Sequence, residues 1–304
     1  MAHDGQIFSP LIAHSKKTKE SMEAPIVTTK NGKVKGSVHQ TVPETVPVFN
    51  YRDIPFAKIQ KFEKPEDFGS WGDEVWDGTA DTRPFPQHDE FASSEDTFAK
   101  FKGLLPMQEE TLLTAMKNMK RATDESLHLG VATTDISASK AVMVWVHGGG
   151  WTSGTANDYN PVPLAAMGDV VVVNISYRLA TAGFLFGNWA LFDQVKALEW
   201  VRDNISDFGG DPNNVTIFGE SAGGWSMDAL LCSEKASGLF HKAIAQSGSL
   251  RSVFKFWPIG KNPVYPFLMK KYEVDSIEAL KDKMSLMSAD ELVQVGVDLS
   301  KGTA

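Results

Sequence analysis

Two short apolar runs stand out in the middle of the chain, VMVWV at residues 142–146 and VVVV at residues 170–173. Uninterrupted runs of this length are too short for a usual helix and are typical of strands covered on both faces, as in parallel sheets. From Asn188 to Asp207 the apolar positions recur at steps of three and four, which predicts a helix with one buried face. That face consists of Leu191, Val195, Leu198, Val201 and Ile205.

The residues that follow predict a return to strand and then a second helix. The sequence GGDP at residues 209–212 ends the first helix, and residues 215–218 form another apolar run. Residues 222–231 can continue as helix. Nearer the C-terminus, Ser288 followed three positions later by Glu291 has the form of a capping box, and it opens a short helix that Gly296 could end.

This alternation of strands and helices predicts an α/β fold with a mainly parallel central sheet and helices on both faces. Earlier in the chain, residues 26–29 and 46–49 are rich in β-branched side chains and predict a small antiparallel ribbon. Residues 1–24 are polar and are expected to form a disordered tail. Residues 25–304 are expected to form one domain.

Composition and charge narrow the classes of function. The 304 residues carry a formal net charge of -8, and no Lys/Arg cluster stands out, which argues against a nucleic-acid partner. No apolar stretch in residues 1–30 has the length of a signal peptide or anchor, so we expect no membrane span and slightly favour the cytoplasm. The single Cys232 cannot form an internal disulfide. The sequence predicts neither a metal site nor a cofactor.

The sequence GESAG at residues 219–223 places Ser221 between a predicted strand and a predicted helix. A nucleophilic serine must be exposed at the tip of a sharp turn, and flanking glycines remove the Cβ atoms that would clash there. The start of the helix also brings backbone N–H groups beside a developing oxyanion. A tight glycine turn without catalysis is the alternative reading of these five residues alone.

A second glycine-rich segment, HGGGW at residues 147–151, directly follows a predicted core strand. Three glycines allow the backbone to approach a substrate closely, and amide donors aimed at an oxyanion favour acyl transfer. A phosphate-binding loop is the rival interpretation. It is disfavoured because the chain lacks both the G-x-x-x-x-G-K-[ST] and the G-x-G-x-x-G patterns.

Together these motifs resemble the type-B carboxylesterases, a family that includes cholinesterase-like enzymes and the non-catalytic neuroligins. The resemblance extends over roughly residues 26–295 and is specific from 142 to 249. It is carried by NISYRL at 174–179, LFDQ at 191–194, ALEWVRDNI at 197–205, FGGDP at 208–212, NVTIFGESAGG at 214–224 and FHKAIAQSG at 240–248. It implies an α/β-hydrolase fold.

Carried across residue by residue, the resemblance makes Ser221 the acylated nucleophile and Gly149, Gly150 and Ala222 the oxyanion donors. Glu220 would line the substrate site. In the family, an acidic residue and then a histidine follow the serine and complete the catalytic triad. Here the one histidine after Ser221 is His241, which reads as a surface or packing residue. We therefore expect a C-terminally truncated domain that lacks its last strands and can self-associate through the incomplete sheet.

Two departures from the family concern the loop before residue 124. No tryptophan occurs between Trp76 and Trp145, so a cage for a quaternary ammonium group is not supported. The family usually pairs two cysteines around this loop, whereas Pro86 and Ser126 stand here. The loop is expected to be held by packing alone.

Three functions remain open on the sequence. The first is a carboxylic ester hydrolase that takes small-molecule esters and forms an acyl-serine at Ser221. The second is a catalytically silent, cholinesterase-like binding or adhesion protein. The third is a smaller esterase of the hormone-sensitive-lipase type, which also uses HGGG but needs a well-placed histidine after the serine.

Overall fold

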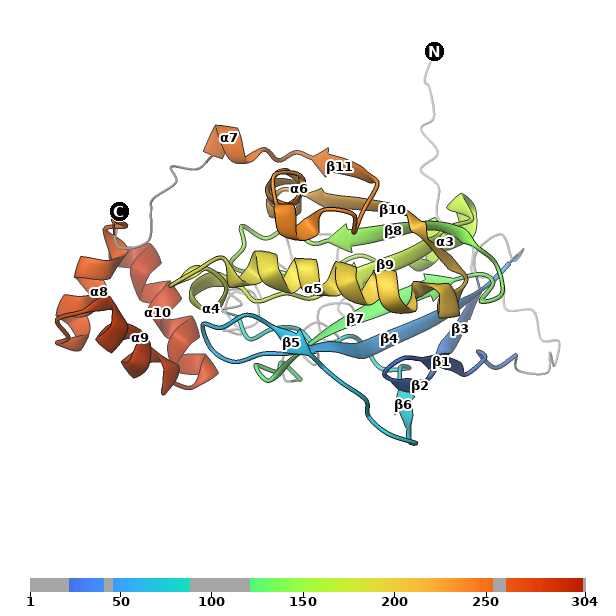
Figure 1. The fold of residues 1–304 in the computed structure, drawn as a ribbon, viewed down its shortest axis with the longest axis horizontal. Coiled ribbons are helices and arrows are strands. Elements are labelled where there is room, and N and C mark those ends of the chain that lie inside the picture. The colour runs from blue at the N-terminus through green and yellow to red at the C-terminus, as the bar shows by residue number, and fades with distance from the viewer. Residues whose placement is uncertain (1–21, 41–45, 88–120, 254–260, 303–304) are drawn as a thin grey trace, which may run out of the picture.

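The computed structural model describes residues 22–40, 46–87, 121–253 and 261–302, so most of the expected tail at residues 1–24 lies outside the described residues. A large mixed sheet forms the centre of the molecule (Figure 1). Its order is β11-β10-β8-β9-β7-β4-β3, and β5 pairs with β4. These strands are β3 (Ser37–Gln40), β4 (Pro47–Lys58), β5 (Glu66–Asp67), β7 (Ser126–Thr133), β8 (Lys140–Val146), β9 (Val171–Ile175), β10 (Gly210–Glu220) and β11 (Lys242–Gln246).

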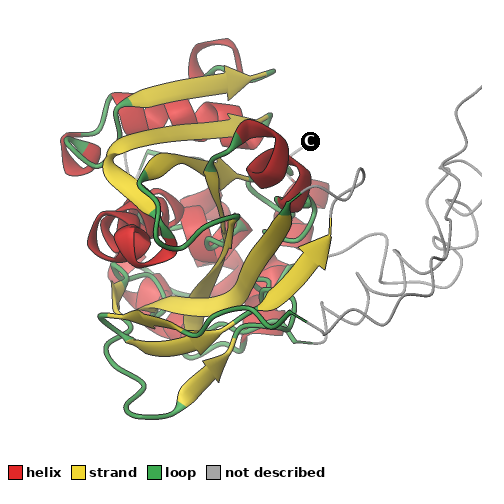
Figure 2. Cartoon of the chain, turned by 90° about the vertical axis from the view of Figure 1, so that its right-hand side faces the viewer, coloured by secondary structure: helices red, strands yellow, loops and turns green. Residues whose placement is uncertain are grey.

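The predicted α/β-hydrolase fold is confirmed, and the sheet divides into a parallel and an antiparallel part. Strands β9, β8, β10 and β11 pair in parallel, while β7, β4 and β3 add antiparallel pairs. The apolar run at 142–146 lies in β8, and residues 171–173 of the second run lie in β9, so both are in the middle of the large sheet. The sheet twists from one edge to the other, as Figure 2 shows.

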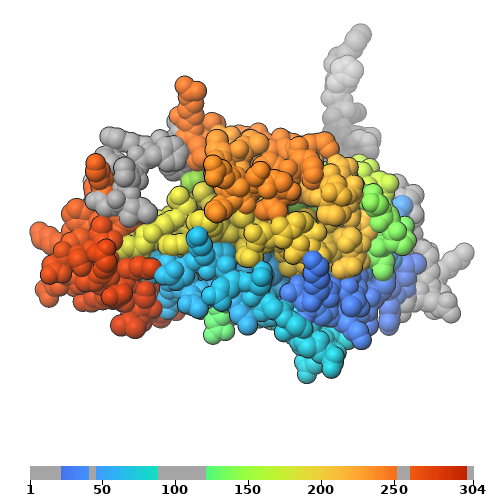
Figure 3. Space-filling model, in the orientation of Figure 1, coloured from blue at the N-terminus to red at the C-terminus, as the bar shows by residue number. Residues whose placement is uncertain are grey.

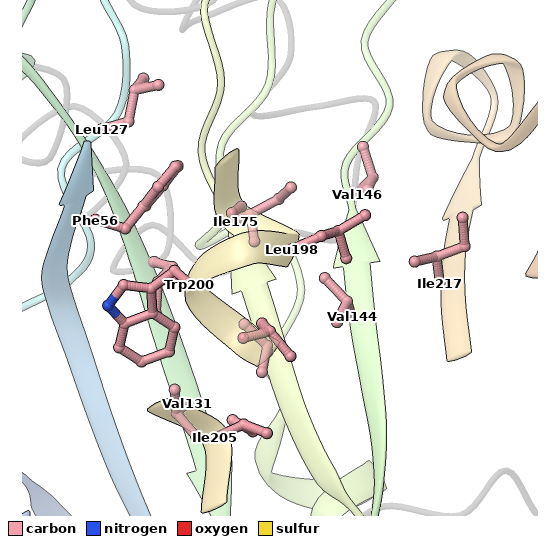
Figure 4. Packing of buried hydrophobic residues seen from close by; sticks show 14 of the residues in the cluster. Phe56, Leu127, Val131, Val144, Val146, Ile175, Leu198, Trp200, Ile205 and Ile217 are labelled. Carbon is pink, nitrogen blue, oxygen red and sulfur yellow. The ribbon is translucent and has the colours of Figure 1, made fainter. Parts of the chain in front are cut away.

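Helices cover the two faces of this sheet, and the strand residues divide between them. Helix α5 (Trp189–Asn204), continued by the 3-10 helix η1 (Ile205–Phe208), packs on one face. Leu198, Val144 and Ile175 lie in the core on this face (Figure 4). The same core also contains Val171 and Val173. Val172 points to the opposite face and packs under helix α3 (Val162–Gly168). Because both faces are buried, β9 contains apolar residues at successive positions.

A helical cluster at one end of the molecule has a core of its own. It consists of α8 (Val264–Tyr272), α9 (Ile277–Ser285) and α10 (Ala289–Gly302), the red elements of Figures 1 and 3. The capping box that opens α10 is present, since the Ser288 amide donates to Glu291 at 2.7 Å and the Glu291 amide donates to Ser288 Oγ at 3.2 Å.

The prediction that Gly296 ends this helix is wrong, because α10 continues to Gly302. A Cβ atom added to Gly296 would lie 3.1 Å from Thr181 Oγ1 and 3.7 Å from the Cβ of Ala180. Both residues belong to helix α4 (Ala180–Phe184). The glycine therefore allows two helices to approach closely and does not terminate one of them.

The predicted antiparallel ribbon is also wrong in its pairing. Residues 27–29 form β1, which pairs with β2 (Gly32–Lys35), and these two strands with β6 (Val75–Asp77) form a separate small sheet. Residues 47–58 form β4 of the large sheet. The remaining elements are α6 (Ala222–Leu231), η2 (Glu234–Ala236) and α7 (Leu250–Val253). Of the helices described, none is long and apolar enough to span a bilayer.

Candidate active site

Ser221 lies at the turn between β10 and α6, in a backbone conformation that non-glycine residues rarely adopt. Its φ is 55° and its ψ is -117°. The turn is held from both sides, because the Ser221 amide donates to the Gln246 carbonyl at 2.8 Å and the Ser221 carbonyl accepts from the Trp225 amide at 3.0 Å. A strained residue fixed by its neighbours is a feature of functional turns, including the nucleophile elbow.

The glycines on either side of Ser221 are required by close packing. A Cβ atom added to Gly219 would lie 2.7 Å from the Val146 carbonyl oxygen, and one added to Gly223 would lie 2.1 Å from the same oxygen. No side chain fits at such distances. The turn of β10 into α6 therefore rests directly on the end of β8.

The glycine loop at residues 148–150 passes beside Ser221. A Cβ atom added to Gly148 would lie 3.3 Å from the Cβ of Ser221 and 2.8 Å from the carbonyl oxygen of Glu220. Gly149 and Gly150 have φ values of 103° and 64°, and the Gly149 carbonyl accepts from the amides of Thr152 and Ser153 at 3.0 Å. The two segments that the sequence analysis singled out thus meet in space.

The expected oxyanion donors lie in these two segments. Ala222 is the first residue of α6, where a backbone N–H has no acceptor within the helix. Among the described residues, the amides of Gly149 and Gly150 have no hydrogen-bond acceptor either. Glu220 Oε2 lies 3.1 Å from the position of a Cβ atom on Gly148, which places this carboxylate beside the glycine loop.

His147 is buried beside the glycine loop and contacts it. It is 1% exposed, its Nδ1 is 2.9 Å from the Gly148 carbonyl oxygen, and its ring stacks on Tyr177 with centroids 4.3 Å apart. Burial lowers its pKa to about 4, although the bond to Gly148 acts in the opposite direction. The Tyr177 hydroxyl also donates to the His147 carbonyl at 2.7 Å. A neutral, stacked imidazole in this position shapes the loop.

An aromatic cluster that the sequence analysis did not identify borders the site. The Trp151 ring stacks on Phe184 at 4.7 Å and meets Trp225 edge-on at 5.4 Å. The Trp151 indole donates to Ser226 Oγ at 3.0 Å, and so does the buried amide of Gln194 at 3.0 Å. The signal in the sequence was the position of Trp151 directly after the glycine loop and of Trp225 four residues after Ser221.

Comparison with known proteins assigns the family. The profile of the carboxylesterase family matches residues 23–271. This chain belongs to that family. The para-nitrobenzyl esterase of Bacillus subtilis (strain 168) is 35% identical over 295 residues, covering 91% of this chain and 54% of the relative. Human cocaine esterase is 39% identical over 240 residues, covering 74% of this chain and 40% of the relative.

Solved structures give the same result. A thermophilic pNB esterase superposes with a TM-score of 0.75 at 32% identity, covering 91% of this chain and 54% of that one. The chain therefore spans about half the length of the esterases it matches.

The family resemblance implies a catalytic histidine beside Ser221, but His241 does not lie there. The His241 amide donates to the Val215 carbonyl at 2.8 Å, which places His241 beside the middle of β10, six residues before Ser221. At about 3.3 Å per strand residue the two lie far beyond hydrogen-bond reach. Among the described residues no histidine is bonded to Ser221, and no group of three or more His, Cys, Asp or Glu side chains could hold a metal ion.

The loop that was expected to be held by packing alone lies for the most part outside the described residues, but its described flanks are joined by ion pairs. Asp53, which is 2% exposed and has a φ of 54°, accepts from Arg83 Nε at 3.0 Å and from Arg121 at 3.1 Å. Its carboxylate also lies 3.2 Å from His128 Nδ1. One buried carboxylate thus binds guanidinium groups on both sides of residues 88–120. The sequence gives little sign of this, because the three partners are far apart along the chain.

Proposed function

We propose that this protein is a carboxylic ester hydrolase that forms an acyl-serine intermediate at Ser221 and acts on small-molecule esters. The observation that carries the proposal is the packing of Gly148 against Ser221, where an added Cβ atom would lie 3.3 Å from the serine Cβ. This packing brings a strained serine beside backbone amides that have no acceptor in the part of the chain that the structure describes. Such an arrangement suits the tetrahedral oxyanion of acyl transfer.

In the proposed reaction, Ser221 Oγ attacks the ester carbonyl carbon while a general base takes the hydroxyl proton. The amides of Gly149, Gly150 and Ala222 donate hydrogen bonds to the oxyanion, each contributing about 3 kcal/mol to the transition state. The intermediate collapses, and the alkoxy group leaves as the alcohol after it has gained a proton. Water then attacks the acyl-serine in the same way, which releases the acid and restores Ser221.

Glu220 and the aromatic cluster would bound the substrate. The Glu220 carboxylate lies against Gly148, so it adds negative charge next to the acyl centre. Trp151 and Trp225 present partly exposed rings beside the glycine loop and the first turn of α6. The para-nitrobenzyl and other esterases reported above support hydrolysis over the silent, adhesion-type alternative.

A fluorophosphonate probe tests the proposal, because it phosphonylates an activated serine. We expect mass spectrometry to find the label on Ser221, and we expect Ser221→Ala to abolish it. Ser285→Ala, on helix α9, is the matched control and keeps the label. A folded wild-type protein that remains unlabelled would contradict the hydrolase and favour the silent module.

A second proposal concerns the edge strand β11. Among the described residues no strand pairs with its outer edge, and Ile244 is 45% exposed there. We propose that copies of the chain associate through this edge, since an open edge with apolar side chains is a template for pairing. Sedimentation should show association that weakens in Ile244→Lys. A monomer at every concentration would contradict the proposal.

A further inference from the structure

A side-chain amide holds the glycine loop from outside the turn. Gln87 Nε2 donates to the Gly154 carbonyl at 2.9 Å, and the Gly154 amide donates to Gln87 Oε1 at 2.6 Å. One side chain thus satisfies both backbone groups of a single residue, as a neighbouring strand would. Gly154 has a φ of 109°, a conformation that glycine adopts far more readily than other residues.

Gly154 in turn fixes the position of Gly148. A Cβ atom added to Gly154 would lie 2.5 Å from the Gly148 carbonyl oxygen and 2.5 Å from His147 Nδ1, so the loop closes tightly on itself. Gly148 is also the residue that packs against Ser221. A continuous series of close contacts therefore leads from Gln87 through Gly154 and Gly148 to the nucleophile.

Gln87 extends from a firmly anchored segment, residues 81–87, which we call the strap. The Arg83 amide donates to Asp53 Oδ1 at 2.8 Å, and the Arg83 carbonyl accepts from Ser176 Oγ at 3.3 Å. At Thr82, the amide donates to Asn157 Oδ1 at 3.0 Å and the carbonyl accepts from Asn157 Nδ2 at 2.6 Å. The strap is bonded to strand β4, to the residue after β9 and to the loop beyond Gly154.

We infer that Gln87 is a positioning residue, which holds the glycine loop at its working distance from Ser221. This inference rests on the proposed function and deepens it, because it names the residue that holds the oxyanion donors in position. Preorganised donors stabilise a transition state only when their support is rigid. Gln87 supplies that support without touching the substrate.

The strap offers a matched control for this role. Asn157 makes the same two-point amide bridge as Gln87, to Thr82 in place of Gly154, and contacts neither Gly148 nor Ser221 in the hydrogen bonds described. Gln87→Leu and Asn157→Leu each remove one bridge between the strap and the loop. A merely structural role would make the two variants alike.

Hydrogen exchange of the full chain, followed by mass spectrometry, measures how well the loop amides are protected and does not depend on activity. We expect amides in residues 148–154 to exchange about tenfold faster in Gln87→Leu, and to remain within about twofold of wild type in Asn157→Leu. Gln87→Glu keeps the acceptor for the Gly154 amide and should give an intermediate rate. It also serves as the second variant if Gln87→Leu does not fold.

Equal exchange in Gln87→Leu and wild type would overturn the inference, and so would equal acceleration by both leucine variants. Measurements of ester hydrolysis and of probe labelling give a second test that is independent of hydrogen exchange. If wild type reacts, Gln87→Leu should lower kcat about tenfold and leave KM within about twofold, because the lost contact matters in the transition state. If wild type does not react, the proposed hydrolase fails while the exchange experiment still decides the role of Gln87.

Discussion

Gly223 lies so close to the Val146 carbonyl that an added Cβ atom would be 2.1 Å from its oxygen. Val146 is the last residue of β8 and directly precedes the glycine loop, while Gly223 is in the first turn of the helix that follows Ser221. The two segments that carry the proposed chemistry are therefore in direct backbone contact. Neither can move without displacing the other.

Gly223→Ala should destabilise the protein by about 3 kcal/mol, because the clash is with backbone that cannot rotate away. Urea unfolding measures this change, and the fluorophosphonate label on Ser221 should be lost with it. Gly168→Ala is the control, since its nearest atom would be 3.4 Å from an added Cβ. Alanine in place of that helical glycine should be neutral or slightly stabilising, and equal losses in both variants would contradict the argument.

Ser226→Ala should cost about 2 kcal/mol, because it removes the acceptor from two donors, the Trp151 indole and the Gln194 amide. Ser226 is 0% exposed, so water cannot replace the hydroxyl. Chemical unfolding followed by tryptophan fluorescence reports both the stability and the setting of Trp151. Ser237→Ala, on an exposed turn, should change the free energy of unfolding by less than about 0.5 kcal/mol. A loss no larger in Ser226→Ala would show that these bonds contribute little.

His147 should make the protein less stable as the pH falls. Its pKa is about 4 in the folded state, against 6.5 for a free histidine side chain. Between these values the unfolded chain binds the proton and the folded chain does not, so the contribution is complete above pH 6.5 and decreases as the pH falls towards about 4. The full effect is roughly 3 kcal/mol.

Unfolding of wild type and His147→Gln at neutral and acidic pH checks this expectation. Glutamine does not titrate, so the variant should lose less stability on acidification than wild type. Parallel pH profiles for the two proteins would rule out a role for this imidazole in acid denaturation.

Asp53→Asn should reduce the free energy of unfolding by about 2–3 kcal/mol, because it leaves Arg83 and Arg121 without their shared carboxylate. The Arg83 and Arg121 side chains are 36% and 31% exposed, so partial hydration keeps the loss below that of a fully buried pair. Asp77→Asn is the comparison, since its pair with Lys35 is exposed and contributes less than about 0.5 kcal/mol. Similar urea midpoints for both variants would show that the ion pairs of Asp53 contribute no more to stability than an exposed pair.

Local patterns in the sequence predicted the elements that carry the site. The helix at residues 222–231 and the strands around 142–146 and 171–175 were predicted because one helical face or two buried strand faces leave a clear pattern. The same holds for the meeting of Ser221 with the glycine loop, since both follow strands that end at one edge of a parallel sheet.

Features that depend on distant partners could not be predicted. Gly296 looked like a helix end because its contact with Thr181 is not visible in the local sequence. Strand β1 pairs with β2 and not with β4, and the residues of β1 alone do not reveal which partner it takes. The bridge from Gln87 to Gly154 joins residues 67 apart, and a lone glutamine carries no pattern that would reveal it.

The ion pairs of Asp53 with Arg83 and Arg121 also hold together the two ends of the segment between these arginines, whatever its length. Arg83 and Arg121 lie on either side of residues 88–120 in the sequence, and both side chains reach the same carboxylate. Whatever number of residues lies between them, the two anchoring points stay together, and each doubling of such a length costs only about 0.6 kcal/mol in closure entropy. Sequences of different length between Arg83 and Arg121 can therefore be joined to the same carboxylate on strand β4 without moving either end.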